Sequence, residues 1–198
     1  LAGAAAIPVV NALTDREHPC QALADLLTIR EHLGGLDGVV LAFIGDGNNV
    51  YHSLALAGAL AGMEVRLAHP PGYGPDEGIV AAARTLAASS GGHLAFEQDP
   101  RRAVKNADVV YTDAWTSMGQ ETELEERRSA FQGFQVDDAL LDLAGPDAVV
   151  MHCLPAHRGE EITSSVMDGR RSLVFRQAEN RLHVQKALLV EILGRTTA

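Results

Sequence analysis

Residues 39–50 read Val39-Val40-Leu41-Ala42-Phe43-Ile44-Gly45-Asp46-Gly47-Asn48-Asn49-Val50. The first seven form a continuous apolar run, as expected of a strand that is covered on both faces. The run stops at the turn residues 46–49, and the alanine-rich segment 50–62 is typical of a buried helix. This stretch therefore predicts one strand–turn–helix unit.

Strand and helix patterns alternate through most of the chain beyond this unit. The expected strands are 64–69, 94–96, 108–112 and 148–151, and the expected helices between them are 76–89 and 100–106. Strands that alternate with helices at this spacing form a parallel sheet with right-handed crossovers. The predicted fold class is α/β: a doubly wound parallel sheet in a Rossmann-like, three-layer α/β/α arrangement.

Two amphipathic helices, 19–32 and 178–193, flank this alternating region. Neither contributes a strand, so both are expected to pack outside the sheet, against a preceding domain. The chain opens without Met, and residues 7–12 resemble a strand that leaves a larger body. We therefore expect this sequence to be the later part of a longer protein.

Composition narrows the class of protein. The chain has 198 residues, 46% of them apolar and 21% charged, and a net charge of −10. The acidic balance argues against a nucleic-acid surface, which needs a basic face. No apolar run reaches the roughly 18 residues of a spanning helix, so no membrane partner is expected, and the expected location is cytoplasmic. Cys20 and Cys153 lie far apart and are expected to be free thiols.

The turn after the first strand resembles a dinucleotide-binding turn but lacks its third glycine. The second strand also ends in His69-Pro70, without the acidic residue that holds a ribose. Asn48 and Asn49 could instead hold a zwitterionic ligand at the start of the helix. The alternative is that one of them only caps the helix.

The fourth strand is followed by Asp113-Ala114-Trp115-Thr116-Ser117-Met118-Gly119. An aspartate at this position can pair with an ammonium group, and Ser117 can donate a hydrogen bond to a carboxylate. The charged residues 121–128 come next. They are typical of a solvated helix face, or of a loop that closes over a site with Gly119 as its hinge.

The last strand leads into His152-Cys153-Leu154-Pro155-Ala156-His157-Arg158-Gly159. Because ligands of open α/β sheets bind at the carboxyl ends of strands, a thiol near two histidines and an arginine could share a proton with a substrate there. The alternative is a buried cysteine and a strand-ending proline.

His18-Pro19-Cys20-Gln21 precedes the first flanking helix. An imidazole and an amide one turn apart at a helix start could polarise a carbonyl oxygen and hold its amide. The alternative is that His18 is only a polar cap.

Five motifs stand in the order that ornithine carbamoyltransferases show, and the resemblance covers essentially the whole chain. They are His18-Pro19-Cys20-Gln21, Asp46-Gly47-Asn48-Asn49, Asp113 to Gly119, His152-Cys153-Leu154-Pro155 and Ala178-Glu179-Asn180-Arg181. Aspartate carbamoyltransferases resemble the chain less, because they carry Thr at the position of Cys20. Acetylornithine and succinylornithine enzymes also match less well, because the Ser117-Met118-Gly119 loop goes with free ornithine.

The resemblance implies roles for residues on the carbamoyl phosphate side. His18 and Gln21 match the motif that contacts the carbamoyl group, and Arg181 matches an arginine that reaches carbamoyl phosphate. Cys153 and Leu154 match the loop where both substrates meet, and the Leu154–Pro155 bond is expected to be cis.

The ornithine-binding positions are matched by Asn49, Asp113, Ser117 and Met118. The resemblance then implies transfer of the carbamoyl group to the side-chain amine of ornithine, which gives citrulline and phosphate without a metal or organic cofactor. The catalytic residues implied are His18, Arg181, Asp113 and Cys153. The alternatives are a fragment that binds an amino acid without catalysis, or a carbamoyltransferase for acetylornithine or putrescine.

The chain also departs from the family pattern. The phosphate-binding Ser-Thr-Arg-Thr-Arg segment of the family's amino-terminal domain does not occur in it. We expect residues 1–22 to end that domain, 23–177 to form the ornithine-binding domain, and 178–198 to form a helix that packs back on the missing part. Family members complete each site across a homotrimer interface, so this chain alone is expected to be inactive.

Overall fold

Five parallel strands form the sheet of this computed structural model, which describes residues 2–116 and 123–194. The strands are β1 (Val40–Ile44), β2 (Glu64–Ala68), β3 (His93–Glu97), β4 (Val109–Thr112) and β5 (Val149–His152). Their order is β3-β2-β1-β4-β5, and every neighbouring pair is parallel. The order reverses beside β1, so the prediction of a doubly wound α/β sheet is confirmed.

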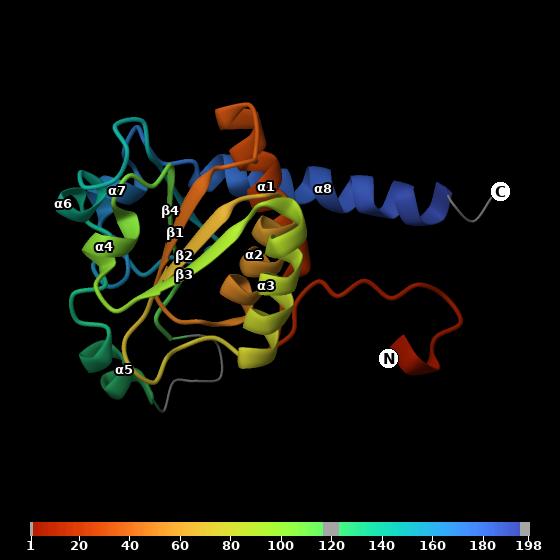
Figure 1. Ribbon diagram of the computed structural model, residues 1–198, viewed down its shortest axis with the longest axis horizontal. Helices are drawn as coiled ribbons and strands as arrows, with labels where there is room; N and C mark the ends of the chain where they lie inside the picture. The colour runs from red at the N-terminus through yellow and green to blue at the C-terminus, as the bar shows by residue number, and fades with distance from the viewer. Residues whose placement is uncertain (1, 117–122, 195–198) are drawn as a thin grey trace.

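Helices cover both faces of the sheet (Figure 1). One face carries α1 (Pro19–Leu33), α2 (Asn49–Leu60) and α3 (Glu77–Ser90), and the other carries α4 (Pro100–Val104), α6 (Asp138–Leu141) and α7 (Ser164–Met167). The remaining helices are the short η1 (Ala2–Ala4), α5 (Leu124–Ala130) and α8 (Val174–Gly194). The expected three layers are therefore present.

Alternate residues of each strand point into two separate cores. On β1, Leu41 and Phe43 pack under α1 and α2, whereas Ala42 and Ile44 pack under α4 and α6. Phe43 stacks on Tyr111 of β4 with 5.3 Å between the ring centroids. Burying a side chain of this size contributes about 1.5–3 kcal/mol, so the two apolar faces of the strands fix the sheet between its helices.

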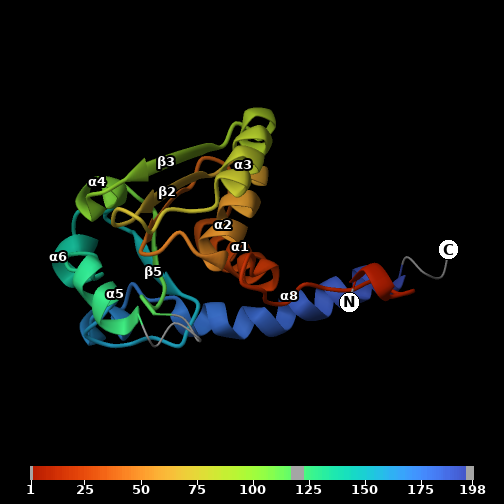
Figure 2. The same cartoon turned by 90° about the horizontal axis from the view of Figure 1, so that it is seen from below.

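The first flanking helix differs from the prediction. Ala22 and Ile29 of α1 belong to the main core, so α1 packs on the sheet. The first turns of α8 also join the body, because Val174 is fully buried, but its last turns extend away from the sheet, as Figures 1 and 2 show. Leu189 and Leu193 are 52% and 65% exposed there. The sequence pattern identified both helices but not which surface each one covers.

The expected strand at residues 7–12 is wrong. The segment is exposed and outside every strand, because its backbone pairs with no edge of the five-stranded sheet. Both cysteines are free thiols, as expected. No helix in the described ranges is long and apolar enough to cross a bilayer.

Candidate functional site

Asp113 joins three chain segments at the carboxyl edge of the sheet. It follows β4 directly, and its Oδ1 accepts a hydrogen bond from Cys153 Sγ at 2.9 Å. Its Oδ2 accepts one from Asn48 Nδ2 at 2.7 Å. We expected Asn49, Asp113 and Cys153 to cluster at this edge; each follows a strand there, but the bond to Asp113 comes from Asn48 and not from Asn49. A thiol and a carboxamide therefore lie within hydrogen-bond distance of the same carboxylate, one at each oxygen.

The turn after β1 uses its two asparagines differently. Asn48 caps α2 through Oδ1, which accepts from the backbone N–H groups of Val50 and Tyr51 at 3.0 and 3.2 Å. Asn48 is thus both the cap and a partner of Asp113, a double role that the sequence did not predict. Asn49 donates instead to the carbonyl oxygen of Thr14 at 2.8 Å. Its side chain therefore faces the segment that precedes α1.

Gly47 is required in this turn because another loop passes very close. A Cβ atom at this position would lie 2.3 Å from the backbone nitrogen of Pro75. The backbone N–H of Gly47 also donates a hydrogen bond to the carbonyl oxygen of Tyr73, at 2.9 Å. Any side chain here would push the two loops apart and move Asn48 away from Asp113.

The loop after β5 is held by a buried histidine–carboxylate pair. The Leu154–Pro155 bond is cis, as expected, and Leu154 has a φ of 63°. Leu154 N donates to His152 Nδ1 at 2.8 Å, and His152 Nε2 lies 3.1 Å from Glu161 Oε1. Both side chains of this pair are fully buried. Because both ring nitrogens of His152 are engaged in this way, the histidine fixes the loop that carries Cys153.

The other polar residues of that loop point elsewhere. The guanidinium group of Arg158 forms two hydrogen bonds with Asp168, at 2.5 and 2.8 Å, and His157 is half-exposed beside Glu161. The expectation of two histidines and an arginine near the thiol is therefore met by His152 alone.

Burial raises the pKa of Cys153 well above its usual range, and the negative charge of Asp113 raises it further. The thiol therefore stays protonated at neutral pH and donates to Asp113. We predict that iodoacetamide alkylates Cys153 at pH 8 at least about tenfold more slowly than free cysteine, because the thiolate is the nucleophile. Asp113→Asn should lower this pKa and speed the reaction. Mass spectrometry of the Cys153 peptide over pH 7–10 measures both rates, and alkylation at the rate of free cysteine would contradict the assignment.

A second polar cluster connects the start of α1 to α8. Arg181 Nη1 donates to Gln21 Oε1 and lies 3.3 Å from His18 Nε2. The backbone N–H of His18 donates to Ser53 Oγ of α2 at 2.8 Å, which holds this segment against the body. His18 stands at the N-cap position of α1, but its side chain makes no capping bond. The capping alternative is therefore wrong.

Burial lowers the pKa of His18, and the nearby charge of Arg181 lowers it further. The charge of Asp113 acts in the opposite direction, with a smaller effect. His18 is therefore neutral at pH 7. Because the charges of Asp113 and Arg181 both act on His18, the two clusters lie close enough together to influence the same imidazole.

Ser117 and Met118 lie outside the described residues. Arg127 anchors the chain beyond them: it lies in α5 and its side chain is only 8% exposed. Its Nη1 is 2.6 Å from Asp46 Oδ2 and 2.9 Å from the carbonyl oxygen of Trp115. The charged stretch is thus not simply a solvated face, because Arg127 ties it to the turn after β1.

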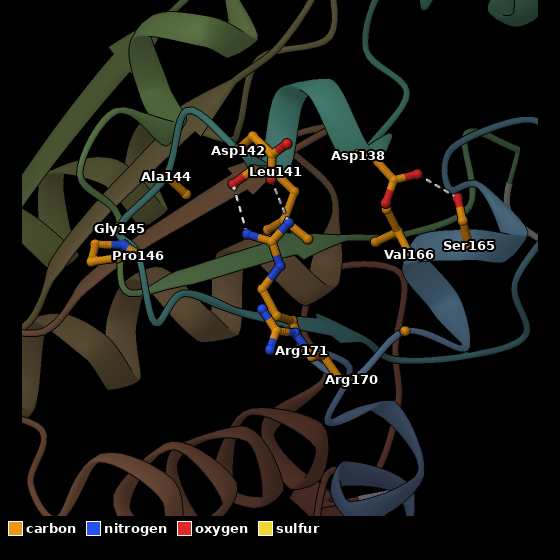
Figure 3. Close-up of a pocket in the computed structure, with 11 residues that line it drawn as sticks. Asp138, Leu141, Asp142, Ala144, Gly145, Pro146, Ser165, Val166, Arg170 and Arg171 are labelled. Carbon is orange, nitrogen blue, oxygen red and sulfur yellow. Dashed lines mark hydrogen bonds and ion pairs between the residues drawn. The ribbon is translucent and has the colours of Figure 1, made fainter.

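The surface cavity in Figure 3, of about 430 Å³, contains none of these residues. It lies near Gly145, which precedes β5, and therefore at the other end of this strand from Cys153. Its polar groups pair with each other: Arg171 with Asp142 at 2.7 Å, and Ser165 with Asp138 at 2.5 Å. We therefore assign the chemistry to the carboxyl edge.

Comparison with known families agrees with this edge. Residues 37–192 match the Asp/Orn binding domain of aspartate/ornithine carbamoyltransferases. Residues 1–31 match the carbamoyl-P binding domain of the same enzymes. The chain therefore belongs to the aspartate/ornithine carbamoyltransferase family.

The similar proteins include several that are named ornithine carbamoyltransferase. The one from Acidothermus cellulolyticus is 62% identical over 98% of this chain. The structure of ornithine carbamoyltransferase from Pyrococcus furiosus is 54% identical, with a TM-score of 0.94 over 98% of this chain. An N-acetyl-L-ornithine transcarbamylase structure is 35% identical, with a TM-score of 0.79 over 89% of this chain. The chain spans 62% of the length of the first two relatives.

Proposed function

We propose that this chain supplies the ornithine-binding part of an ornithine carbamoyltransferase, which transfers the carbamoyl group of carbamoyl phosphate to the side-chain amine of ornithine. The observation that carries the proposal is the contact of Asp113 with Cys153 and Asn48 at the carboxyl edge of the sheet, within the residues that match the family's Asp/Orn binding domain. Similar proteins that are named ornithine carbamoyltransferase support the same substrate.

On the ornithine side, Asp113 is the group that would pair with an ammonium of the amino acid. A charge-assisted hydrogen bond of this kind is worth about 1.5–3 kcal/mol. Cys153 holds one carboxylate oxygen and Asn48 the other, so the carboxylate has a fixed orientation. Asn49, Ser117, Met118 and Leu154 complete this side in the proposal.

On the carbamoyl phosphate side, His18, Gln21 and Arg181 converge from two helices. Arg181 carries the positive charge that would stabilise a tetrahedral oxyanion, and the neutral His18 would help to polarise the carbonyl oxygen. Attack by the neutral amine on the carbamoyl carbon then releases phosphate, and the proton that the amine loses passes toward the Asp113 carboxylate, which the Cys153 thiol orients. Positioning and oxyanion stabilisation can supply most of such a rate enhancement.

The proposal also covers the oligomeric state and the cellular location of the enzyme. It is a homotrimer in which neighbouring subunits complete each site, and it lies in the cytoplasm. The two unpaired thiols support a reducing compartment.

Amine specificity tests the proposal in the complete enzyme, which we define as a chain with a whole carbamoyl-P binding domain ahead of these residues. With carbamoyl phosphate, we expect kcat/KM for ornithine to exceed that for acetylornithine or putrescine by about tenfold or more, because acetylornithine lacks the charged α-amine and putrescine lacks the carboxylate. Colorimetry detects citrulline, and chromatography detects the other two carbamoylated products.

Preference for either alternative amine would replace the proposed substrate. Calorimetric binding of ornithine without any product would favour an amino-acid-binding fragment instead.

A further inference from the structure

Asp25 is a carboxylate inside the molecule, in the second turn of α1, with no exposed surface. Its Oδ1 accepts hydrogen bonds from Gln21 Nε2 at 2.8 Å and from Gln177 Nε2 at 2.7 Å. Its Oδ2 accepts one from the hydroxyl of Tyr111 at 3.2 Å. Asp25 therefore receives hydrogen bonds from α1, α8 and β4, three elements that carry site residues.

Two pairs of residues at helical spacing form this network. Gln21 and Asp25 are four residues apart on α1, and Gln177 and Arg181 are four residues apart on α8, so each pair lies on one helix face. The pairs bond crosswise, Asp25 with Gln177 and Gln21 with Arg181. Asp25 and Gln177 are both fully buried.

Each bond to Asp25 leads to a residue of the site. Because Gln21 Nε2 donates to Asp25, the carboxamide is oriented so that Gln21 Oε1 accepts from Arg181. Gln177 Oε1 accepts from the backbone N–H of His152 at 2.9 Å, the residue immediately before Cys153. Tyr111 stands two residues before Asp113 on β4. One carboxylate thus connects both halves of the site.

We infer that Asp25 is a positioning residue for the carbamoyl transfer: it sets the amide orientation of Gln21 and, through Gln177, the start of the loop that carries Cys153. The inference depends on the proposed function only where its test measures citrulline formation. Burying a carboxylate this deeply costs free energy, because the charge loses its hydration, and hydrogen bonds must offset that loss. Burial, partly offset by the hydrogen bonds from Gln21, Gln177 and Tyr111, raises the pKa of Asp25 to about 7.

Asp25→Asn tests this inference with little change in shape. The carboxamide has only one acceptor oxygen. Its NH2 group would face hydrogen-bond donors that point at a carboxylate in the unsubstituted protein. In the complete enzyme we expect kcat/KM for citrulline formation to fall about tenfold or more. Hydrogen exchange at the His152 amide should also become faster, because Gln177 loses its fixed partner.

Thr28→Val is the matched control. Thr28 lies one turn further along α1, is equally buried, and accepts from Asn180 of α8 at 2.9 Å. It joins the same two helices but does not touch Gln21, Gln177 or Tyr111 in the described contacts. Its loss should lower the melting temperature comparably while kcat/KM stays within about twofold and exchange at His152 is unchanged.

Equal effects of the two variants on activity and on His152 exchange would overturn the inference and leave Asp25 a packing residue. If the unsubstituted enzyme forms no citrulline, the proposed function fails, but the exchange comparison still decides the role of Asp25. If Asp25→Asn does not fold, Gln177→Met removes the link between Asp25 and His152, together with the bond of Gln177 to Tyr111. A fall of about tenfold or more in kcat/KM in that variant supports the inference, and a kcat/KM within about twofold of the unsubstituted enzyme overturns it.

Discussion

Asp113→Asn in the complete enzyme is expected to lower kcat/KM for ornithine by about 10- to 150-fold, while KM for carbamoyl phosphate changes by less than about threefold. The substitution removes the charge that pairs with an ammonium group, a loss of about 1.5–3 kcal/mol, and each 1.36 kcal/mol is a factor of ten. It also places an NH2 group near Asn48 Nδ2 or Cys153 Sγ, both of which now donate to the carboxylate. Citrulline formation is measured by varying each substrate in turn at saturating levels of the other.

Asp108→Asn is the matched control for this variant. Asp108 precedes β4 where Asp113 follows it, and its Oδ2 accepts from Val40 N at 2.8 Å. An asparagine can retain that bond, and the position lies at the opposite edge from Cys153. Ornithine saturation and turnover should therefore stay near those of the unsubstituted enzyme. Unchanged values for Asp113→Asn as well would remove Asp113 from the site.

The 198-residue chain alone is expected to form negligible citrulline, below about 1% of the turnover of the complete enzyme. His18, Gln21 and Arg181 reach the carbamoyl group in the proposal, but the Ser-Thr-Arg-Thr-Arg segment that binds the phosphate in the family does not occur in this sequence. Without it, the effective molarity gained by holding two substrates together is lost, and this gain can reach about 10⁵–10⁸ M. Weak ornithine binding should remain measurable by calorimetry. Robust turnover by the chain alone would show that the phosphate site has been misplaced.

The sheet was predictable because its signal is local. Continuous apolar runs such as 39–45, each followed by a turn or a helix, specify strands that are covered on both faces. The strand ends then bring Asp113, Cys153 and the asparagine turn to one edge, since parallel strands share their carboxyl edge. The short helices α6 and α7 were missed because they have only four residues each, too few for a clear period.

The sequence could not show which polar side chains form hydrogen bonds or ion pairs with each other. Adjacent asparagines have the same chemistry, so only the backbone geometry of the turn shows that Asn48, not Asn49, bonds to Asp113. Asp25 was overlooked among the apolar residues of α1, although its spacing of four from Gln21 was a usable signal. Arg127 looked like part of an exposed charge run, because its partner Asp46 is 81 residues away in the chain.

Complementation tests most directly the claim that this chain carries the ornithine half of a carbamoyltransferase site. The 198-residue chain is mixed with a separately expressed carbamoyl-P binding domain, and citrulline is measured beside each part alone and beside a mixture that contains Asp113→Asn. We expect citrulline from neither part alone but from the mixture of unsubstituted parts, and turnover at least about tenfold lower in the mixture that contains Asp113→Asn. Equal turnover in the two mixtures, or citrulline from the carbamoyl-P binding domain alone, would contradict the claim.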